Sequence, residues 1–552
     1  MSTKQFYKWS DIKKDSPYFS MIRTTIETAA YGNNVYPVET LKEAYKLACD
    51  SPGTIITDMP VFEPEKLGLP AGANVLVFND GAVKGRCAAA RNILGEPGVS
   101  EEEFAIKIRD AIYDTRYKTM YHAQAYVGLS ENFMTKAHLI IPEDQENIMY
   151  SWLLNFQYIT EEFFAKYQAS QEIPNEGDIY IFSDPTWSHP DHPLGLTFFD
   201  PENNCAAILG MRYFGEHKKG TLTLAWGMAN RNGYAACHGG QKRYNLEGGK
   251  SFVAGVFGLS GSGKSTITHA KHGGKYDITV LHDDAFIIDT ETMSSTALEP
   301  SYFDKTQDYP MEDPDNKFLL TVQNNGVTLD EKGNKVLVTE DTRNGNGRAV
   351  KSILWSENRE NFFPEPANAI MWLMKDPTLP PVVKITDPIL AATMGATLAT
   401  KRTSAERLAE GVDPNALVVE PYANPFRTYK LINDYNVFKD LFEKKNVDCY
   451  IFNTGHFGEK KVTPAITLGS LESIVESKAK FSDMGVSGMQ YLPVDGFNPD
   501  FTDPTYKAQF IARLKDRIGF LENKMTARGG YDKLPQESVD SMKAVAADAE
   551  KL

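Results

Sequence analysis

The segment Gly258-Leu259-Ser260-Gly261-Ser262-Gly263-Lys264-Ser265-Thr266 contains the residues whose types and spacing are best suited to chemistry. Its glycines allow backbone N–H groups to curve around phosphate oxygens without Cβ clashes. Lys264 supplies a positive charge for β- and γ-phosphates, and the Ser265 hydroxyl can bind a metal ion. The pattern therefore predicts a loop that binds a nucleoside triphosphate. The alternative interpretation is an ordinary turn rich in glycine and serine.

The residues on either side of this loop agree with the prediction. Residues 251–257 read Ser-Phe-Val-Ala-Gly-Val-Phe, which is typical of a buried strand, and residues 266–271 can begin a helix. A helix start adds free N–H donors and the positive end of a dipole to the phosphate site. We therefore expect the order strand, phosphate loop, helix.

Acidic and basic residues that could complete such a site occur on both sides of the loop. Asp283 and Asp284 follow an apolar run about twenty residues beyond it, where a carboxylate usually meets nucleotide-bound Mg²⁺. The alternative is a helix cap or turn aspartate. Residues 340–343 read Glu-Asp-Thr-Arg, an acidic-then-basic turn whose alternative interpretation is an exposed ion pair.

A basic segment precedes the loop. Residues 212–220 read Arg-Tyr-Phe-Gly-Glu-His-Lys-Lys-Gly, and His238 follows nineteen positions after Lys219. Taken alone, adjacent lysines usually form a solvated pair on the surface, and a lone histidine is usually a hydrogen-bonded structural residue. Their position next to a predicted phosphate site makes them candidates for binding and metal ligation.

Composition limits the classes of protein to consider. The chain has 552 residues, a hydrophobic fraction of 42% and a net charge of -15, which argue for large folded domains and against a nucleic-acid binder. Its five cysteines show no C-x-x-C spacing, which favours a reduced, cytoplasmic setting. No signal peptide or membrane span is expected.

The mixture of helix and strand patterns predicts an α/β fold with two domains. We place a mixed α+β domain at residues 1–230 and a phosphate-loop domain at residues 231–552. Helices are predicted at residues 101–123 and within 144–167, and residues 400–413 are charged without a clear apolar face, which indicates a mobile loop.

Together these segments resemble the ATP-dependent phosphoenolpyruvate carboxykinase family. That family has Tyr-Gly-Gly-Glu-x-Lys-Lys-Gly, which residues 213–220 match except for one phenylalanine, and its metal-binding lysine and histidine have the spacing of Lys219 and His238. The family loop Gly-Leu-Ser-Gly-Thr-Gly-Lys-Thr-Thr differs only by serine for threonine at two positions. The resemblance runs in order from Arg86 to Thr467. It implies the family's α/β fold, with a substrate-binding N-terminal domain.

The resemblance also implies roles for individual residues. The implied metal ligands are Lys219, His238 and Asp284, with Ser265 at a second ion. The implied catalytic residues are Lys219, Lys264, Asp283, Lys305 and Arg343, and the implied substrate-binding residues are Arg86, Tyr213, Lys219 and Arg343. The implied nucleotide-binding residues are the loop 258–266 with Glu299, Lys461 and Thr467.

Three departures from the family pattern stand out. His282 replaces a glycine before the paired aspartates, residues 270–279 form a longer segment than usual, and Lys461 stands where an arginine is expected.

The reaction implied by the resemblance is oxaloacetate + ATP ⇌ phosphoenolpyruvate + ADP + CO₂, with Mn²⁺ and Mg²⁺. The charged loop at residues 400–413 would be a lid that excludes water. Three alternatives remain: the same chemistry with GTP or pyrophosphate, another phosphate-loop kinase, and a nucleotide-binding protein without turnover. The sequence leaves the oligomeric state open.

Overall fold

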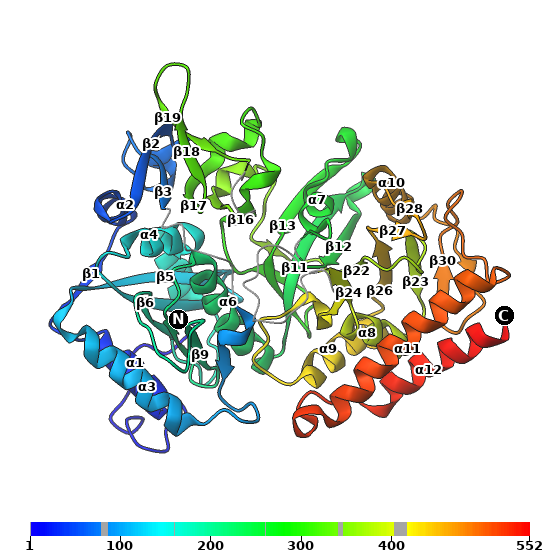
Figure 1. Cartoon of the computed structure of the whole chain (residues 1–552), viewed down its shortest axis with the longest axis horizontal. Helices are drawn as coiled ribbons and strands as arrows, with labels where there is room; N and C mark the ends of the chain where they lie inside the picture. Colours follow the sequence, from blue (N-terminus) through cyan, green and yellow to red (C-terminus); the bar gives the residue numbers. More distant parts are fainter. Residues whose placement is uncertain (1, 79–86, 159, 260, 341–345, 402–416) are drawn as a thin grey trace. The chain divides into compact units, whose positions relative to one another are not determined.

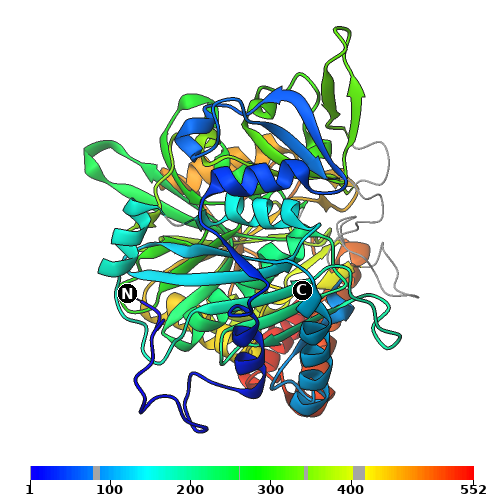
Figure 2. The ribbon, with the colours of Figure 1, turned by 90° about the vertical axis from the view of Figure 1, so that its left-hand side faces the viewer.

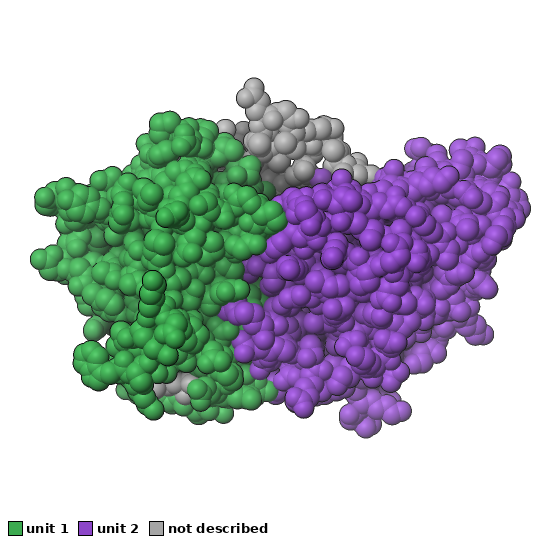
Figure 3. Space-filling view, turned by 90° about the horizontal axis from the view of Figure 1, so that it is seen from below, with its two compact units in different colours: residues 1–228, 297–357, 404–414 green, residues 229–296, 358–403, 415–552 purple. Residues whose placement is uncertain are grey.

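A computed structural model describes residues 2–78, 87–158, 160–259, 261–340, 346–401 and 417–552 (Figure 1). The chain divides into two compact units, coloured separately in Figure 3. Apart from the residues outside the described ranges, unit 1 contains Met1–Met228 and Ala297–Glu357, and unit 2 contains Ala229–Thr296, Asn358–Thr403 and Asn415–Leu552. Ala297–Glu357 belongs to unit 1 although it follows a stretch of unit 2 in the sequence. The division into functional domains at residue 230 stays a prediction.

The described part of unit 1 contains two sheets of five or more strands and a two-stranded hairpin, β18 Gly326–Leu329 with β19 Lys335–Val338. The larger has the strand order β1-β5-β6-β8-β10-β9-β4, with β7 beside β5. Its strands are β1 Val35–Val38, β5 Met120–Ser130, β6 Phe133–Pro142, β8 Ile179–Asp184, β10 Cys205–Leu209, β9 Leu196–Asp200, β4 Arg91–Ile93 and β7 Gln157–Tyr158. The smaller, called here the small sheet, has the order β16-β20-β17-β3-β2. Its strands are β16 Tyr302–Lys305, β20 Arg348–Lys351, β17 Leu319–Gln323, β3 Asn74–Phe78 and β2 Thr54–Pro60.

Helices cover both faces of the larger sheet. The helices of unit 1 are α1 Met21–Ala29, α2 Leu41–Asp50, α3 Glu101–Asp114, α4 Glu146–Asn155, α5 Glu161–Ala169 and α6 Phe214–Arg231, the last of which crosses the boundary. The helices α1 and α3 lie side by side on one face of the sheet (Figure 2). Their apolar residues share a core with residues of the sheet that include Leu209. Successive strand residues point to opposite faces, and Ile208 meets α6 at Gly220. The helix α6 therefore packs on the other face.

Unit 2 is built on one mixed sheet with the order β21-β15-β14-β11-β12-β22-β26-β23-β30-β29 and β13 beside β11. Its strands are β21 Phe362–Phe363, β15 Ser295–Ala297, β14 Ala285–Asp289, β11 Tyr234–Asn245, β12 Ser251–Phe257, β22 Ala369–Met374, β26 Asp448–Asn453, β23 Val382–Ile385, β30 Met489–Tyr491, β29 Ser482–Asp483 and β13 Asp277–His282. Its helices are α7 Lys264–His269, α8 Pro388–Ala396, α9 Leu431–Lys444, α10 Pro464–Val475, α11 Pro504–Thr526 and α12 Gln536–Lys551.

The two faces of this sheet have different partners. Ile267 of α7 and Leu471 of α10 join a core with alternate residues of β12 and β22. On the other face, Phe438 of α9 meets Phe257 and Trp372, with ring centroids 5.6 and 5.1 Å apart. This arrangement confirms the predicted α/β fold. In the described part of the chain, no helix is both long and apolar enough to cross a membrane.

One predicted helix is too long. The sequence suggests a helix over residues 101–123, but α3 ends at Asp114 and β5 begins at Met120. Val35 to Val38 pair with Met120 to Ala123 in a parallel ladder, and β6 pairs on the other side. Residues 120–123 therefore form a strand because they pair with distant segments of the chain. Such pairing cannot be seen in the local pattern of apolar residues.

The close approach of β11 to α7 predicts the effect of a glycine substitution. A Cβ on Gly240 would lie 2.1 Å from Thr268 Oγ1, and Thr268 is fully buried in α7. Gly240→Ala is expected to lower the free energy of unfolding by about 1–3 kcal/mol through overpacking. Urea unfolding measures this loss.

The matched control is Gly519→Ala in α11, where nothing lies within 4 Å of the added Cβ. Alanine there is expected to stabilise the helix by up to about 1 kcal/mol. Equal stability of Gly240→Ala and the unsubstituted protein would contradict the described packing of β11 on α7.

Candidate active site

The predicted phosphate loop has the expected strand–loop–helix context in unit 2. The strand β12 ends at Phe257 and α7 begins at Lys264. Gly261 and Gly263 adopt φ values of 81° and 94°, in the left-handed region that favours glycine. Thr454 Oγ1 donates a 2.7 Å hydrogen bond to Ser262 O, which anchors the loop to the chain just beyond β26.

Three predicted residues meet at one carboxylate oxygen. Lys264 Nζ lies 3.0 Å from Asp284 Oδ1, and His238 Nε2 lies 3.1 Å from the same atom. These residues come from α7, from the turn after β13 and from β11. The order β12-β11-β13 brings them together, because both β12 and β13 pair with β11.

The pair His238 and Asp284 is suited to a metal ion. His238 Nδ1 donates to the carbonyl of Ala423, so a neutral imidazole keeps its lone pair on Nε2, facing Asp284. Cis ligands of an octahedral ion with bonds of about 2.1 Å are roughly 3 Å apart, close to the observed separation. Among the described residues, no group of three or more His, Cys, Asp or Glu side chains is arranged to hold a metal ion by itself. A metal ion here would therefore need other ligands, such as an amine, water or substrate.

In unit 1, the predicted substrate residues lie at the start of α6. Tyr213 is buried, and Gly215 leaves room for its ring, because a Cβ there would lie 2.3 Å from Tyr213 Cε1. Lys218 is fully buried and pairs with Glu299 at 3.0 Å. Lys219 is partly exposed, with Nζ 5.7 Å from the centroid of the Trp226 ring. The two adjacent lysines therefore have different environments, since only Lys218 is fully buried.

The small sheet positions a further predicted cation. Lys305 is the last residue of β16, and its register partner on β20 is Arg348. Asn325 connects this end of the sheet to its surroundings: Thr306 Oγ1 donates to Asn325 Oδ1 at 3.0 Å, and Asn325 Nδ2 donates to Val338 O at 2.9 Å.

Comparison with known proteins decides the family. A family model described as phosphoenolpyruvate carboxykinase matches residues 74–483, most of the chain. This chain belongs to the phosphoenolpyruvate carboxykinase family. It is similar to phosphoenolpyruvate carboxykinase (ATP) from Aeropyrum pernix, with 27% identity over 316 residues, 54% of this chain and 63% of that protein. It is also similar to the protein of that name from Bradyrhizobium sp. strain ORS 278, with 22% identity over 465 residues and 80% of each chain.

Membership of the phosphoenolpyruvate carboxykinase family confirms the resemblance stated from the sequence. The roles of individual residues stay predictions. Arg86, Ser260 and Arg343, together with residues 402–413 of the predicted lid, lie outside the described residues. Glu299 is fully buried in unit 1, where Asn155 Nδ2 also donates to it at 2.6 Å. These contacts hold Lys218, and the predicted role of Glu299 in nucleotide binding stays untested.

The remaining predicted nucleotide residues follow β26. Lys461 is exposed on a short hairpin, β27 His456–Phe457 with β28 Lys460–Lys461. Thr467 is buried in the first turns of α10 and bonds back to Thr463 O at 3.4 Å. Ser265 and Thr266 are exposed on α7.

His282 shapes the turn that carries the paired aspartates. It is fully buried, and its Nδ1 accepts hydrogen bonds from the N–H groups of Asp284 at 3.1 Å and Ala285 at 3.2 Å. Burial opposes the charged form of Asp283, yet nearby His269, whose Nε2 lies 3.5 Å away, and Lys264 hold its pKa well below the usual range. The histidine that replaces a family glycine thus has a structural role.

A buried lysine that sequence reasoning missed lies behind the phosphate loop. Lys242 Nζ donates to Ile267 O at 2.7 Å and Ala270 O at 3.3 Å, at the end of α7. It also lies 3.2 Å from Nε2 of His272, whose Nδ1 is 3.0 Å from Glu472 of α10. His272 belongs to the segment 270–279, so the extra residues join α7 to α10. The unusual length of this segment was the only signal.

Burial of Lys242 predicts a pH dependence of stability. Burial lowers the pKa of Lys242 to about 7, partly offset by Glu472, whereas an unfolded lysine titrates near 10.4. Between about pH 7 and 10 the unfolded chain binds a proton that the folded chain has released, so stability rises with pH. Below about pH 7 both states bind it and this dependence ends.

In the variant Lys242→Met, the free energy of unfolding is therefore expected to increase less between pH 7 and pH 9 than in the unsubstituted protein. Urea unfolding at pH 7 and pH 9 measures the change in the free energy of unfolding for each protein. Lys46→Met, at an exposed position on α2, is the matched control and should keep the slope of the unsubstituted protein. Identical slopes for all three proteins would contradict a buried Lys242 that is neutral at pH 9.

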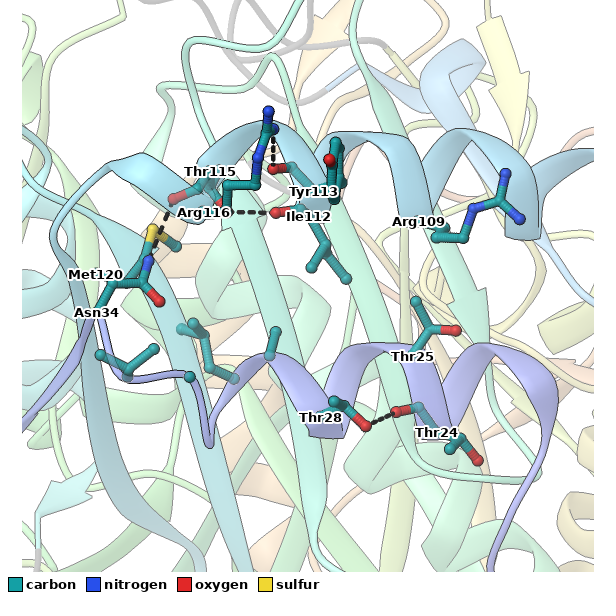
Figure 4. Close-up of a pocket in the computed structure, with 14 residues that line it drawn as sticks. Thr24, Thr25, Thr28, Asn34, Arg109, Ile112, Tyr113, Thr115, Arg116 and Met120 are labelled. Atoms are coloured by element: carbon teal, nitrogen blue, oxygen red, sulfur yellow. Dashed lines mark hydrogen bonds between the residues drawn. The ribbon is translucent and has the colours of Figure 1, made fainter.

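A groove between α1 and α3 has a volume of about 490 Å³ and contains no predicted site residue (Figure 4). Its polar side chains are largely satisfied by nearby backbone: Thr28 Oγ1 donates to Thr24 O at 2.6 Å, and Arg116 Nη1 donates to Tyr113 O at 2.8 Å. This groove offers little directed chemistry, and the candidate active site is the one described above.

Proposed function

We propose that this chain is an ATP-dependent phosphoenolpyruvate carboxykinase that interconverts oxaloacetate and ATP with phosphoenolpyruvate, ADP and CO₂. The observation that carries the proposal is the meeting of Lys264 and His238 at Asp284 behind a phosphate loop. A phosphate-loop kinase of another kind needs the lysine and the aspartate, but it has no need of a histidine in this place. Family membership supports the same conclusion.

The reaction has two steps with different demands. Breaking the C–C bond of oxaloacetate releases CO₂ and leaves its electron pair as an enolate of pyruvate. The enolate oxygen then forms a bond to the γ-phosphorus of ATP, the bond to the β-phosphate oxygen breaks, and ADP leaves. The protein must therefore stabilise negative charge on the enolate and on the transferring phosphoryl group.

In unit 2, the phosphate loop and Lys264 would bind the β- and γ-phosphates. Lys264 Nζ donates a 3.0 Å hydrogen bond to Asp284 Oδ1, which holds the ammonium beside the proposed metal ligand. His238 and Asp284 would hold a divalent cation, for which we propose Mn²⁺, and Ser265 would hold Mg²⁺ with the nucleotide. When bound, these ions supply Lewis-acid stabilisation of oxyanions.

In unit 1, Lys305 and Arg343 would spread the charge of the transferring group, while Arg86 would bind a substrate carboxylate through a bidentate fork. Tyr213 would position the substrate. Lys219 is the predicted third metal ligand, and it can act so only as the neutral amine.

The identity of the phosphoryl donor can be tested directly. Lys461 stands where the family has an arginine, which keeps GTP or pyrophosphate as the alternative. The deciding experiment is formation of oxaloacetate from phosphoenolpyruvate and bicarbonate with Mn²⁺ and Mg²⁺, comparing ADP, GDP and phosphate as acceptors. Turnover with ADP supports the proposal, turnover only with GDP or phosphate moves it to the alternative, and none with any acceptor overturns it.

We predict that removing the charge of Lys264 or Asp284 abolishes most phosphoryl transfer. Lys264→Ala and Asp284→Asn are each expected to lower kcat by more than about 10²-fold, because charge stabilisation in the transition state is lost. The acceptor assay measures the rate, and far-ultraviolet circular dichroism confirms that each variant folds. Folded variants that keep substantial turnover would argue against these two roles.

The proposed metal ligand in unit 1 makes a separate prediction. Lys219→Arg is expected to abolish stimulation by Mn²⁺, because a guanidinium stays protonated and offers no lone pair. Rates are compared across a Mn²⁺ titration at constant Mg²⁺. Lys46→Arg on α2 is the control, and a Lys219→Arg response equal to that control would exclude Lys219 as a ligand.

The cellular compartment of the protein stays a prediction. All five cysteines are free, which is compatible with the reduced, cytoplasmic environment expected from their number and spacing.

A further inference from the structure

Three polar side chains form a row across one end of the small sheet. Arg348 of β20 pairs in register with Lys305 of β16 on one side and with Gln323 of β17 on the other. Residues directly opposite each other on antiparallel strands place their side chains on the same face of the sheet. Gln323, Arg348 and Lys305 therefore share a face, with the arginine in the middle.

Arg348 is buried, and no residue that the structure describes balances its charge. The residue is 4% exposed, and its Nη1 donates to Gly347 O at 2.8 Å. Its Nη2 is buried and makes no hydrogen bond to any residue that the structure describes. A guanidinium stays protonated in proteins, so this is a buried cationic donor with an unused N–H. Such a group is costly unless something else satisfies it.

Other buried arginines in the chain show the usual solution. Arg517 donates to Asp376 Oδ2 at 2.9 Å and also to Thr397 O. Arg23 pairs with Glu27 at 2.8 Å, and Arg427 pairs with Asp532 at 2.8 Å. Each has a carboxylate partner, which Arg348 lacks among the described residues. Unlike these three arginines, Arg348 has no carboxylate partner among the described residues, so its guanidinium is a candidate site for an anionic ligand.

The surroundings of Arg348 are firmly held and face the start of α6. Gln323 Nε2 donates to Arg212 O at 2.9 Å, and the N–H of Phe214 donates to Gln323 Oε1 at 3.1 Å. These bonds place the row next to the segment that carries Tyr213. Gly347 allows no side chain, because a Cβ would lie 2.2 Å from Thr306 Oγ1. The backbone before Arg348 is thus fixed, while one N–H of its guanidinium has no partner among the described residues.

We propose that Arg348 binds an oxyanion of the substrate, a carboxylate or phosphoryl group of a small acid, beside Lys305. The ammonium of Lys305 and the planar guanidinium of Arg348, which can donate two parallel hydrogen bonds, together suit a group that carries more than one negative charge. The inference deepens the proposed function and rests on it for the identity of the acid. Arg348 is then a substrate-binding residue in unit 1, separate from the nucleotide residues of unit 2.

The first test compares Michaelis constants. Arg348→Gln is expected to raise KM for phosphoenolpyruvate at least tenfold, with KM for ADP changed less than twofold, and Arg348→Lys should restore part of the loss. Arg109→Gln is the control, since this exposed arginine on α3 pairs only with its neighbour Asp110 among the described contacts. An unchanged KM for phosphoenolpyruvate in Arg348→Gln would overturn the proposal.

Thermal unfolding separates binding from a structural role. Removal of an unneutralised buried charge is expected to leave the melting temperature of ligand-free Arg348→Gln equal to or above that of the unsubstituted protein. A lower melting temperature together with equal changes in both Michaelis constants would show that Arg348 serves the fold, and would overturn the proposal.

Ligand binding without turnover distinguishes this inference from the proposed function. The unsubstituted protein and Arg348→Gln are titrated calorimetrically with phosphoenolpyruvate, oxalate and inorganic phosphate, in the absence of nucleotide. Selective loss of oxalate binding identifies a carboxylate site, and selective loss of phosphate binding identifies a phosphoryl site. Equal affinities of both proteins for all three probes would overturn the inference, even if the enzyme turns over. Loss of binding in a protein without turnover would support it while the proposed function fails.

Discussion

The carboxylate of Asp284 is the constraint on which the nucleotide side of this protein depends. One oxygen accepts from the lysine of the phosphate loop and faces the imidazole of His238. The three residues come from three different elements, so β11, β13 and α7 must keep their mutual register for the contact to exist. His282 holds the turn after β13, and Lys242 holds the end of α7. Both of these buried residues therefore help to position Asp284 and Lys264.

In unit 1, by contrast, positively charged side chains lie close together. The small sheet brings Lys305 and Arg348 side by side, although they are more than forty positions apart in the sequence. Lys218 is neutralised within the protein by Glu299, whereas Arg348 is not neutralised by any described residue. A protein of net charge -15 that binds the anionic substrates proposed above must concentrate its cations locally, and the strand register places two of them side by side.

The sequence was most informative where chemistry and local structure coincide. The phosphate loop, its strand and its helix were predicted because the glycines, the lysine and the apolar run are contiguous. The nineteen-position spacing of Lys219 and His238 identified the family but said nothing about Ala423, which fixes the imidazole. Lys242, His282 and Arg348 could not be assigned from the sequence, because their roles arise from pairing and burial between distant segments. The same cause ended α3 early at Asp114, where β5 was needed for the sheet.

The parallel pairing of β17 with β3 has a consequence for synthesis. Thr321 to Gln323 of β17 pair with Leu76 to Phe78 of β3. Because Ala229–Thr296 of unit 2 lies between them in the sequence, β3 can pair with β17 only after that segment has been synthesised. A nascent chain that has reached the end of α6 therefore exposes an unpaired edge at β3, a hazard for association with other chains. Unit 1 therefore cannot finish folding when only its N-terminal part, up to the end of α6, has been synthesised. Because of this order along the chain, unit 1 completes its small sheet only after part of unit 2 has been synthesised.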